Sequence, residues 1–196
     1  MFKTSKLIYL SIILFFTSKI FPSDSFDFNT FNNHGVVGLI NMPTARFYEE
    51  SSFGFTFNYN NPDQKITMTS FPFDWLEASF FYTNIDGKPY CEFIEDPVCN
   101  QDYKDKGFNT KLRLKKEGVL PALAIGINDI AGTGFYSSEY IVASYGINKT
   151  DIHFGLGWGN YNRNEDLKNP LIYLDKRFET RPTEYEDKGG QFQPSR

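Results

Sequence analysis

One stretch of this chain of 196 residues alternates in a way that fits only one kind of secondary structure. In FNTKLRLK, one parity carries mostly apolar side chains, at Phe108, Thr110, Leu112 and Leu114. The other parity carries an amide and three basic groups, at Asn109, Lys111, Arg113 and Lys115. Because successive side chains of a strand point to opposite faces, the stretch predicts a β-strand between two very different environments.

The same alternation recurs along the chain and predicts an all-β fold. It appears in SFGFTFNYN, KITMTSF, DWLEASFFYTN, ALAIGIN, SEYIVASYG and DIHFGLGWGNY, which gives about seven strands between Ser51 and Tyr161. In SEYIVASYG both parities are apolar, and we assign Tyr140 and Val142 to the apolar face because Glu139 lies opposite them. Several connections are short turns, whereas 84–105 and 129–138 are longer. Neighbouring strands are therefore expected to pair in an antiparallel, up-and-down order.

Alternation alone does not say which solvent meets the apolar faces. A soluble β-sandwich turns them inward, whereas a transmembrane β-barrel turns them outward to lipid. The apolar faces carry no charge in their central portions, and a charge at the bilayer midplane would cost ~2–4 kcal/mol. The opposite faces are rich in small residues such as Gly54, Gly126 and Gly155, which leave space for a plug or a passage. Together with Tyr59 and Trp158 near strand ends, these features favour the barrel.

Composition divides the chain into four parts. Residues 1–25 are expected to be a signal peptide, with Lys3 and Lys6 before the apolar stretch LIYLSIILFFTS and a cleavage site near Ser25. No Cys follows this stretch, so a lipoprotein anchor is not expected. Residues 26–50 would form a periplasmic or plug segment, 51–161 the barrel strands, and 162–196 a polar loop or disordered tail.

The strand count is odd and low for a complete barrel. Single-chain bacterial barrels have an even number of strands, at least ~8. Either GVVGLINM supplies a further strand, or the chain is an incomplete N-terminal portion of a larger barrel.

Charge and motifs exclude several functions. A formal net charge of −4 argues against binding of nucleic acid. The two histidines, His34 and His153, have no partners at the spacing of a catalytic triad, and no glycine-rich loop opens a helix. We therefore expect no enzyme activity, no cofactor and no metal site.

A small set of charged residues remains as candidates for function. The basic row in the strand expected at residues 108–115 would face a wet lumen and attract an acidic glycan, although a solvated strand face explains the row equally well. The candidate glycan or lumen contacts are Lys111, Arg113, Lys115, Glu77 and Arg46, and Arg46 is expected to pair inside the lumen. Cys91 and Cys99 lie close together in an exported polar loop and are expected to form a disulfide.

Several stretches, taken in order, carry a family resemblance: GVVGLINMPTARF, FPFDWLEASFFYT, YKDKGFNTKLRLKKEG, LPALAIGINDIAGTGFYSSEYIVAS, FGLGWG and LKNPL. Over roughly residues 35–171, the chain resembles the N-terminal part of the YjbH family of outer-membrane proteins associated with bacterial exopolysaccharide production. The resemblance implies a β-barrel in the outer membrane of a Gram-negative bacterium, with a part in assembling or secreting extracellular polysaccharide. The implied partners are outer-membrane lipid, the exopolysaccharide and other export proteins. It supplies no catalytic residues.

Two other functions stay open from the sequence. The first is a soluble periplasmic β-sandwich that binds a glycan or a protein partner. The second is a secreted enzyme that modifies polysaccharide, which would need two carboxylates across a cleft. Glu77 and Glu139 are the strand-borne candidates for that pair.

Overall fold

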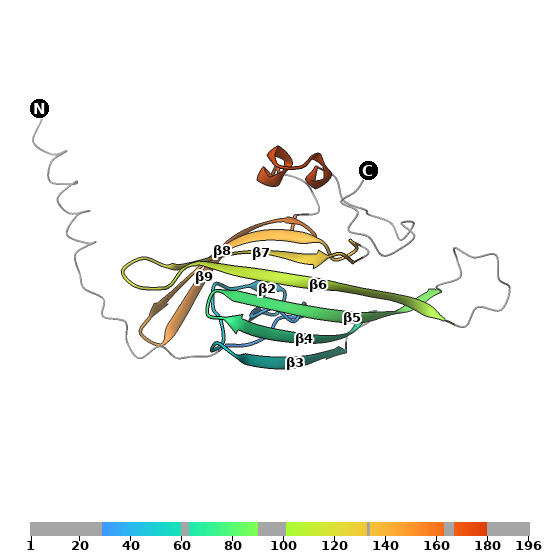
Figure 1. Cartoon of the computed structure of the whole chain (residues 1–196), viewed down its shortest axis with the longest axis horizontal. Helices are drawn as coiled ribbons and strands as arrows, with labels where there is room; N and C mark the ends of the chain where they lie inside the picture. Colours follow the sequence, from blue (N-terminus) through green and yellow to red (C-terminus); the bar gives the residue numbers. More distant parts are fainter. Residues whose placement is uncertain (1–28, 60–62, 90–100, 133, 163–166, 180–196) are drawn as a thin grey trace, which may run out of the picture.

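The structure, a computed structural model, describes residues 29–59, 63–89, 101–132, 134–162 and 167–179. Its main element is a seven-stranded antiparallel sheet in which each strand pairs with the next along the chain (Figure 1). The strands are β3 (Ser52–Tyr59), β4 (Asp63–Phe73), β5 (Leu76–Pro89), β6 (Asp102–Lys115), β7 (Ala122–Ile130), β8 (Ser138–Ile147) and β9 (Thr150–Gly159). The predicted all-β, antiparallel, up-and-down order is confirmed.

The sheet is open within the residues that the structure describes. β3 and β9 are its two edge strands, and no register pairs one with the other. The stretch GVVGLINM does not add an eighth strand to it. Instead, β1 (Gly38–Leu39) and β2 (Met42–Pro43) pair only with each other in a small hairpin. The described strands do not close into a barrel, and the transmembrane barrel, of which this chain would be an incomplete N-terminal portion, stays a prediction.

Residues 29–51, which we call the N-terminal segment, lie against one face of the sheet, and we call this face the inner face. Phe31 of the segment stacks on Tyr48 and packs against Phe71 of β4. A Cβ at Gly54 of β3 would meet the Phe31 ring at 2.8 Å, so this glycine makes room for the segment. The buried apolar cluster between segment and sheet consists of Val36, Val37, Ala45, Phe47, Phe71, Ala122, Ala124, Tyr140 and Val142.

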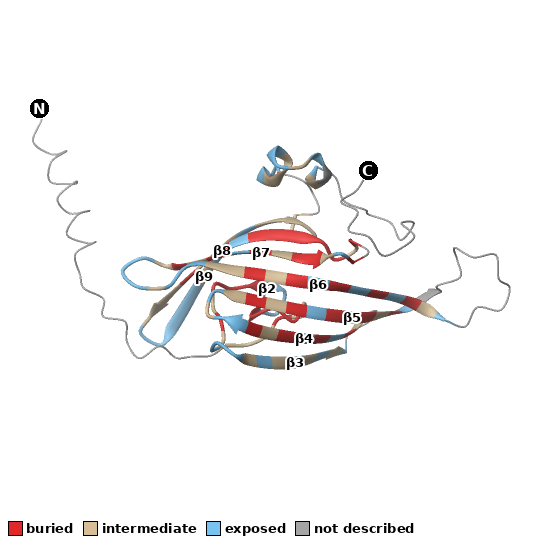
Figure 2. Ribbon diagram, viewed as in Figure 1, coloured by how far each residue is buried: buried red, intermediate tan, exposed pale blue. Residues whose placement is uncertain are grey.

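The opposite, outer face carries exposed apolar side chains. Figure 2 shows how buried and exposed residues alternate along the strands. Along β3 exposure alternates without a break, and Phe57 and Tyr59 are 75% and 84% exposed. Other exposed apolar side chains on this face are Phe53, Phe55, Ile66, Met68, Phe80, Tyr82, Phe108, Ile125, Ile141, Ile152, Phe154 and Leu156. The residues that were predicted to share the apolar side of β3, β6 and β9 do share it.

β8 corrects one expectation from the sequence. Tyr140 and Val142 are buried on the inner face, and Ile141 points outward beside Ile125 of β7. The reason is tertiary: the N-terminal segment presents apolar side chains to this part of the inner face, and Tyr140 and Val142 pack against them. Tyr140 also fills the space that Gly126 leaves directly across the strand pair.

The two ends of the sheet differ in their connections. At one end, which we call the short-turn end, strands are joined by residues 74–75, 116–121 and 148–149. At the other, the long-loop end, they are joined by residues 60–62, 90–101 and 131–137. Two of the three connections at the long-loop end, 90–101 and 131–137, are longer than any connection at the short-turn end.

Residues 167–179 lie over the outer face near β8 and β9. They contain two short 3₁₀ helices, η2 (Pro170–Tyr173) and η3 (Lys176–Phe178). Asn169 donates from Nδ2 to Glu139 Oε2 at 2.9 Å, and Trp158 donates from Nε1 to the Lys168 carbonyl at 3.0 Å. Neither of these helices, nor any other helix in the described ranges, is long and apolar enough to cross a membrane.

Candidate functional site

The inner face of the sheet contains a buried ion pair at its centre. Lys111 of β6 and Glu77 of β5 lie directly opposite each other in the register, and Lys111 Nζ is 2.6 Å from Glu77 Oε2. The two residues are 0% and 1% exposed. Burying an ammonium and a carboxylate is costly unless each is paired and hydrogen-bonded, so their other contacts decide whether this pair is tolerated.

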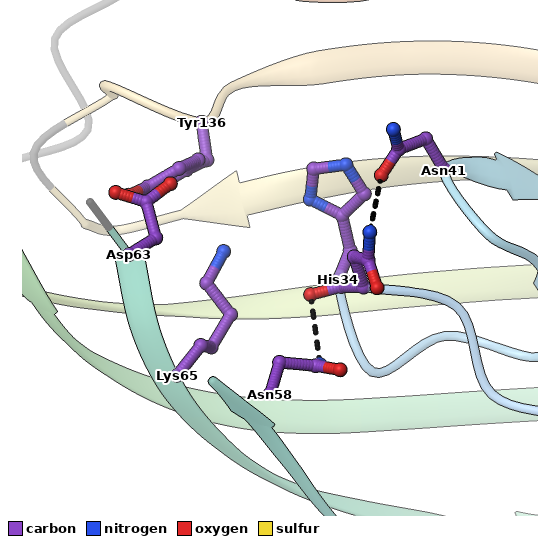
Figure 3. Close-up of a pocket in the computed structure, with 7 residues that line it drawn as sticks. His34, Asn41, Asn58, Asp63, Lys65 and Tyr136 are labelled. Atoms are coloured by element: carbon purple, nitrogen blue, oxygen red, sulfur yellow. Dashed lines mark hydrogen bonds between the residues drawn. The ribbon is translucent and has the colours of Figure 1, made fainter. Parts of the chain in front are cut away.

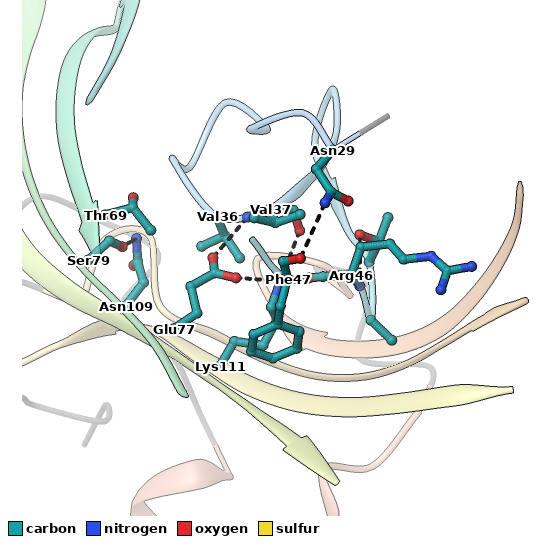
Figure 4. A network of polar contacts seen from close by, with 12 residues as sticks. Asn29, Val36, Val37, Arg46, Phe47, Thr69, Glu77, Ser79, Asn109 and Lys111 are labelled. Carbon is teal, nitrogen blue, oxygen red and sulfur yellow. Dashed lines mark hydrogen bonds and ion pairs between the residues drawn. The ribbon is translucent and has the colours of Figure 1, made fainter. Parts of the chain in front are cut away.

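The N-terminal segment supplies those contacts (Figure 4). The Val37 amide donates to Glu77 Oε1 at 2.8 Å, and Lys111 Nζ donates to the carbonyls of Val37 and Arg46 at 3.2 and 2.9 Å. With Glu77, these two carbonyls match the three donors of the ammonium. The pair therefore holds the segment on the sheet through backbone atoms.

A second attachment point lies at the short-turn end. Arg46 donates from Nε and Nη2 to the two carboxylate oxygens of Asp151 at 2.8 and 2.6 Å. Its Nη2 also lies 2.6 Å from Glu117 Oε2. The hydrogen bond to Asp151 raises the pKa of the Arg46 guanidinium further above its usual range. Bidentate pairs of this kind fix orientation as well as charge.

The predicted basic row does not form a continuous wet track. Lys111 is covered by the N-terminal segment, which removes it from the surface that a polymer reaches. The Arg113 guanidinium is half-buried over the Phe47 ring at 4.3 Å, and Lys115 is exposed at the end of β6. Contact of Arg113 and Lys115 with a glycan stays a prediction.

The carboxylate pair that an enzyme would need is not assembled. Glu77 points to the inner face, where it meets Lys111. Glu139 shares the outward parity of Ile141 on β8 and lies opposite Trp158 of β9. The two carboxylates are therefore on opposite faces of the sheet and do not form the pair across one cleft that this alternative would need.

A serine–histidine–aspartate contact does occur, although no spacing in the sequence predicts it. Ser144 Oγ lies 2.8 Å from His153 Nδ1, and His153 Nε2 lies 3.6 Å from Asp151 Oδ2. Ser144 is buried beneath the N-terminal segment, and its hydroxyl accepts a hydrogen bond from the Ala45 amide at 2.9 Å. The carboxylate is held by Arg46. A hydroxyl that is covered and hydrogen-bonded in this way anchors the segment and has no access to a substrate.

A polar cavity of about 390 Å³ lies at the long-loop end of the inner face (Figure 3). Three separate parts of the chain line it: the N-terminal segment, the β3–β4 pair, and the connection between β7 and β8. Its lining residues are Asn33, His34, Asn41, Asn58, Asp63, Lys65 and Tyr136. Sequence reasoning missed this cavity, and the single available signal was Lys65 among the threonines on the inward parity of β4.

His34 is neutral in this cavity at physiological pH. Burial, followed by the nearby Lys65 ammonium, lowers the pKa of His34 to about 3. Its ring meets the Tyr161 ring edge-on at 5.8 Å, and its carbonyl accepts from Asn109 Nδ2 at 3.0 Å. The histidine thus contributes an uncharged ring to the cavity wall.

Some predicted features lie outside the described residues. These are the signal peptide at residues 1–25, the Cys91–Cys99 disulfide and the end of the tail beyond residue 179. Within the part of the chain that is described, no group of three or more His, Cys, Asp or Glu is placed to hold a metal ion.

Comparison with known proteins gives one family and one curated relative. The family described as "Exopolysaccharide biosynthesis protein YbjH" matches residues 30–196. The chain is 35% identical over 159 residues to "Uncharacterized lipoprotein YjbH" of Escherichia coli (strain K12). That match covers 81% of this chain but only 23% of the relative, so the chain spans about a quarter of the relative's length. No solved structure matches the chain.

Proposed function

Since this chain belongs to the YjbH family of exopolysaccharide biosynthesis proteins, we propose that it forms part of an outer-membrane β-barrel that supports assembly or export of an exopolysaccharide. In this proposal the outer face meets lipid and the inner face surrounds a lumen that the N-terminal segment plugs. The role is structural or conductive rather than catalytic. Its partners are outer-membrane lipid, the polysaccharide and other proteins of the export machinery.

The observation that carries the proposal is the inverted polarity of the sheet. Phe53, Phe55 and Phe57 are exposed on the outer face, while Lys111 and Glu77 are buried on the inner face. Exposed apolar surface of this extent is unfavourable in water, at about 25 cal/mol per Å². A contiguous exposed patch of this kind marks a surface that meets lipid or another protein. Contact with lipid hydrocarbon would remove the cost of exposing this apolar surface to water along the whole face.

The dimensions of the sheet fit a membrane. A tilted strand needs ~9–11 residues to cross the ~25 Å apolar band of an outer-membrane barrel, and β7, β8 and β9 have 9, 10 and 10 residues. Aromatic side chains lie near both ends of this band. Tyr59, Tyr82 and Trp158 lie toward the long-loop end, and the stacked pair Phe73–Trp75 lies at the short-turn end. Such girdles are typical of the two membrane–water interfaces.

A soluble periplasmic β-sandwich is the alternative, and the outer face weighs against it. A sandwich needs a second layer over its apolar face. In the described structure only residues 167–179 lie over that face, near one end of β8 and β9, where Asn169 meets Glu139. The β3 side of the outer face has no such cover within the described ranges.

The test uses the full-length protein in its own envelope. We expect it to sediment with outer membrane in a density gradient and to change its electrophoretic mobility on heating in detergent. Cells that lack the gene are expected to release less exopolysaccharide, with the wild-type copy restoring it. Recovery in the soluble periplasmic fraction would refute the barrel, and unchanged polysaccharide in the deletion strain would refute the export role.

A further inference from the structure

The cavity at the long-loop end contains an ammonium group that has no hydrogen-bonding partner in the described structure. Lys65 is 5% exposed, and its Nζ lies over the rings of Tyr136 and Phe81 at 3.6 and 4.8 Å from their centroids. Figure 3 shows it pointing into the cavity between Tyr136 and His34. Within the described residues no carboxylate is close enough to Lys65 for an ion pair. Cation–π contacts leave the N–H donors of the ammonium available.

The walls add further polar atoms that are available to a ligand. Asn33 donates from Nδ2 to Asn41 Oδ1 at 2.8 Å, and Asn58 donates from Nδ2 to the Asn33 carbonyl at 3.2 Å. These bonds hold the amides in place and leave Asn41 Nδ2 as a donor and Asn58 Oδ1 as an acceptor among the described residues. The Asp63 carboxylate lies beside the Tyr136 hydroxyl and adds acceptor oxygens. Donors and acceptors therefore alternate around one space, with aromatic rings on two sides.

Charge decides which class of ligand this space accepts. Lys65 is a single cation, and the carboxylates of Asp63, Asp105 and Asp129 all act on it electrostatically. His34 adds no charge, because its pKa of about 3 keeps it neutral. Of these carboxylates, Asp63 lines the cavity, and burial raises the pKa of Asp129 to about 7, so Asp129 is only partly ionised at neutral pH. Asp63 and Asp105 already balance the single ammonium, and an anionic ligand would meet the Asp63 carboxylate on the cavity wall. A neutral ligand with many hydroxyl groups meets no such repulsion, and each hydroxyl both donates and accepts a hydrogen bond.

From this geometry we infer that the cavity binds a neutral hexose unit, with its hydroxyls on Lys65, Asp63, Asn41 and Asn58. The volume of about 390 Å³ is within the ~300–1,000 Å³ usual for small-ligand sites and accommodates a short saccharide. The inference deepens the proposed function and rests on it for the source of the sugar, which is the exported polysaccharide. In a barrel with extracellular long loops, this site lies at the outward end of the lumen beyond the plug.

The test measures saccharide binding to the full-length protein in detergent micelles, by ligand-observed NMR and calorimetry. The probes are glucose, galactose, mannose, cellobiose and maltose, each hexose compared with its uronate where one exists. We expect at least one neutral probe to bind and the uronates to bind more weakly. In Lys65→Met, which keeps the apolar stem on its aromatic neighbours but removes the ammonium, binding should weaken by roughly tenfold or more.

Two further variants make the outcome decisive. Lys149→Met removes an exposed lysine in the β8–β9 turn at the opposite end of the sheet, and its binding should equal that of the wild type. Asn41→Ala removes an amide from the exposed tip of the β1–β2 hairpin, so it tests the site even if Lys65→Met fails to fold. Its binding should also weaken.

Three results would overturn the inference: binding of none of the neutral probes, preference for a uronate, or wild-type binding in Lys65→Met or Asn41→Ala. These results differ from failure of the proposed function. A protein that sediments with outer membrane but binds none of the sugars refutes the cavity alone. A soluble protein that binds a hexose through Lys65 refutes the barrel alone.

Discussion

On the inner face of the sheet a lysine and a glutamate are almost fully covered, while on the outer face a row of phenylalanines is open to solvent. Lys111 is 0% exposed and Phe57 is 75% exposed, although both lie within strands of the same sheet. On the inner face the position of each polar atom matters, because each buried charge needs its own partner. On the outer face only the composition matters, because any apolar side chain is compatible with hydrocarbon and a charged one is not. The two faces should therefore respond differently to substitution.

The largest effect is expected at the buried pair. In Lys111→Met, Glu77 keeps the Val37 amide but loses its cation, and the carbonyls of Val37 and Arg46 lose their donor. Breaking a buried pair by removing one partner costs about 3–5 kcal/mol. We expect urea unfolding of the protein in detergent to show that the free energy of unfolding falls by this amount. Protease should also cleave the N-terminal segment sooner.

Two comparisons sharpen this prediction. The double variant Lys111→Met, Glu77→Leu removes both charges of this pair and should recover most of the lost stability. Lys116→Met breaks a pair of the same 2.6 Å length with Asp74, but those side chains are 68% and 43% exposed. Its cost should be far smaller than that of Lys111→Met, because solvent screens an exposed pair. Equal costs for the two lysine variants would mean that the segment is not held by the buried pair.

The second effect concerns the outer face. Phe55 lies in the middle of β3 and points outward between Phe53 and Phe57. If this face meets lipid, Phe55→Arg should destabilise the protein in liposomes by about 2–4 kcal/mol, whereas Phe55→Leu should have a much smaller effect. The measurement is reversible unfolding from preformed liposomes. An arginine that is tolerated as well as leucine would place water, not hydrocarbon, against the outer face.

Local alternation was sufficient to predict the strands and most of their faces. In β6, Phe108 is exposed and its neighbour Asn109 is buried, as the parity of the sequence requires. In β8 the same reasoning reversed the faces, because both parities are apolar and the deciding contact comes from Val36 and other residues far away in the chain. A strand pattern shows that two faces differ, but it does not show what covers them.

The contacts on the inner face needed information that alternation does not contain. Glu77 and Lys111 meet because β5 and β6 pair in the register that places the two residues directly opposite each other, and alternation does not specify which residues of two strands are paired. The cavity depends on three parts of the chain that carry His34, Lys65 and Tyr136. None of these residues is close to the others in sequence, and no spacing rule links them. Charged residues among the inward-facing positions of the strands correctly pointed to polar contacts on the inner face, but only the fold shows which residues they contact.

The smallest expected effect tests the inner face by pH. The pKa of His34, lowered to about 3, means that the folded chain keeps this ring neutral where the unfolded chain takes up a proton. The resulting stabilisation is complete above pH ~6.5 and is lost as the pH falls toward 3. Because the side chain is only half-buried, we expect the free energy of unfolding to be about 1–2 kcal/mol lower at pH 4 than at pH 6.5. His34→Gln removes this titration, so its unfolding free energy in detergent should fall less steeply between pH 6.5 and pH 4 than that of the wild type. Equal slopes for the two proteins would show that water reaches His34 freely and that this end of the inner face is open.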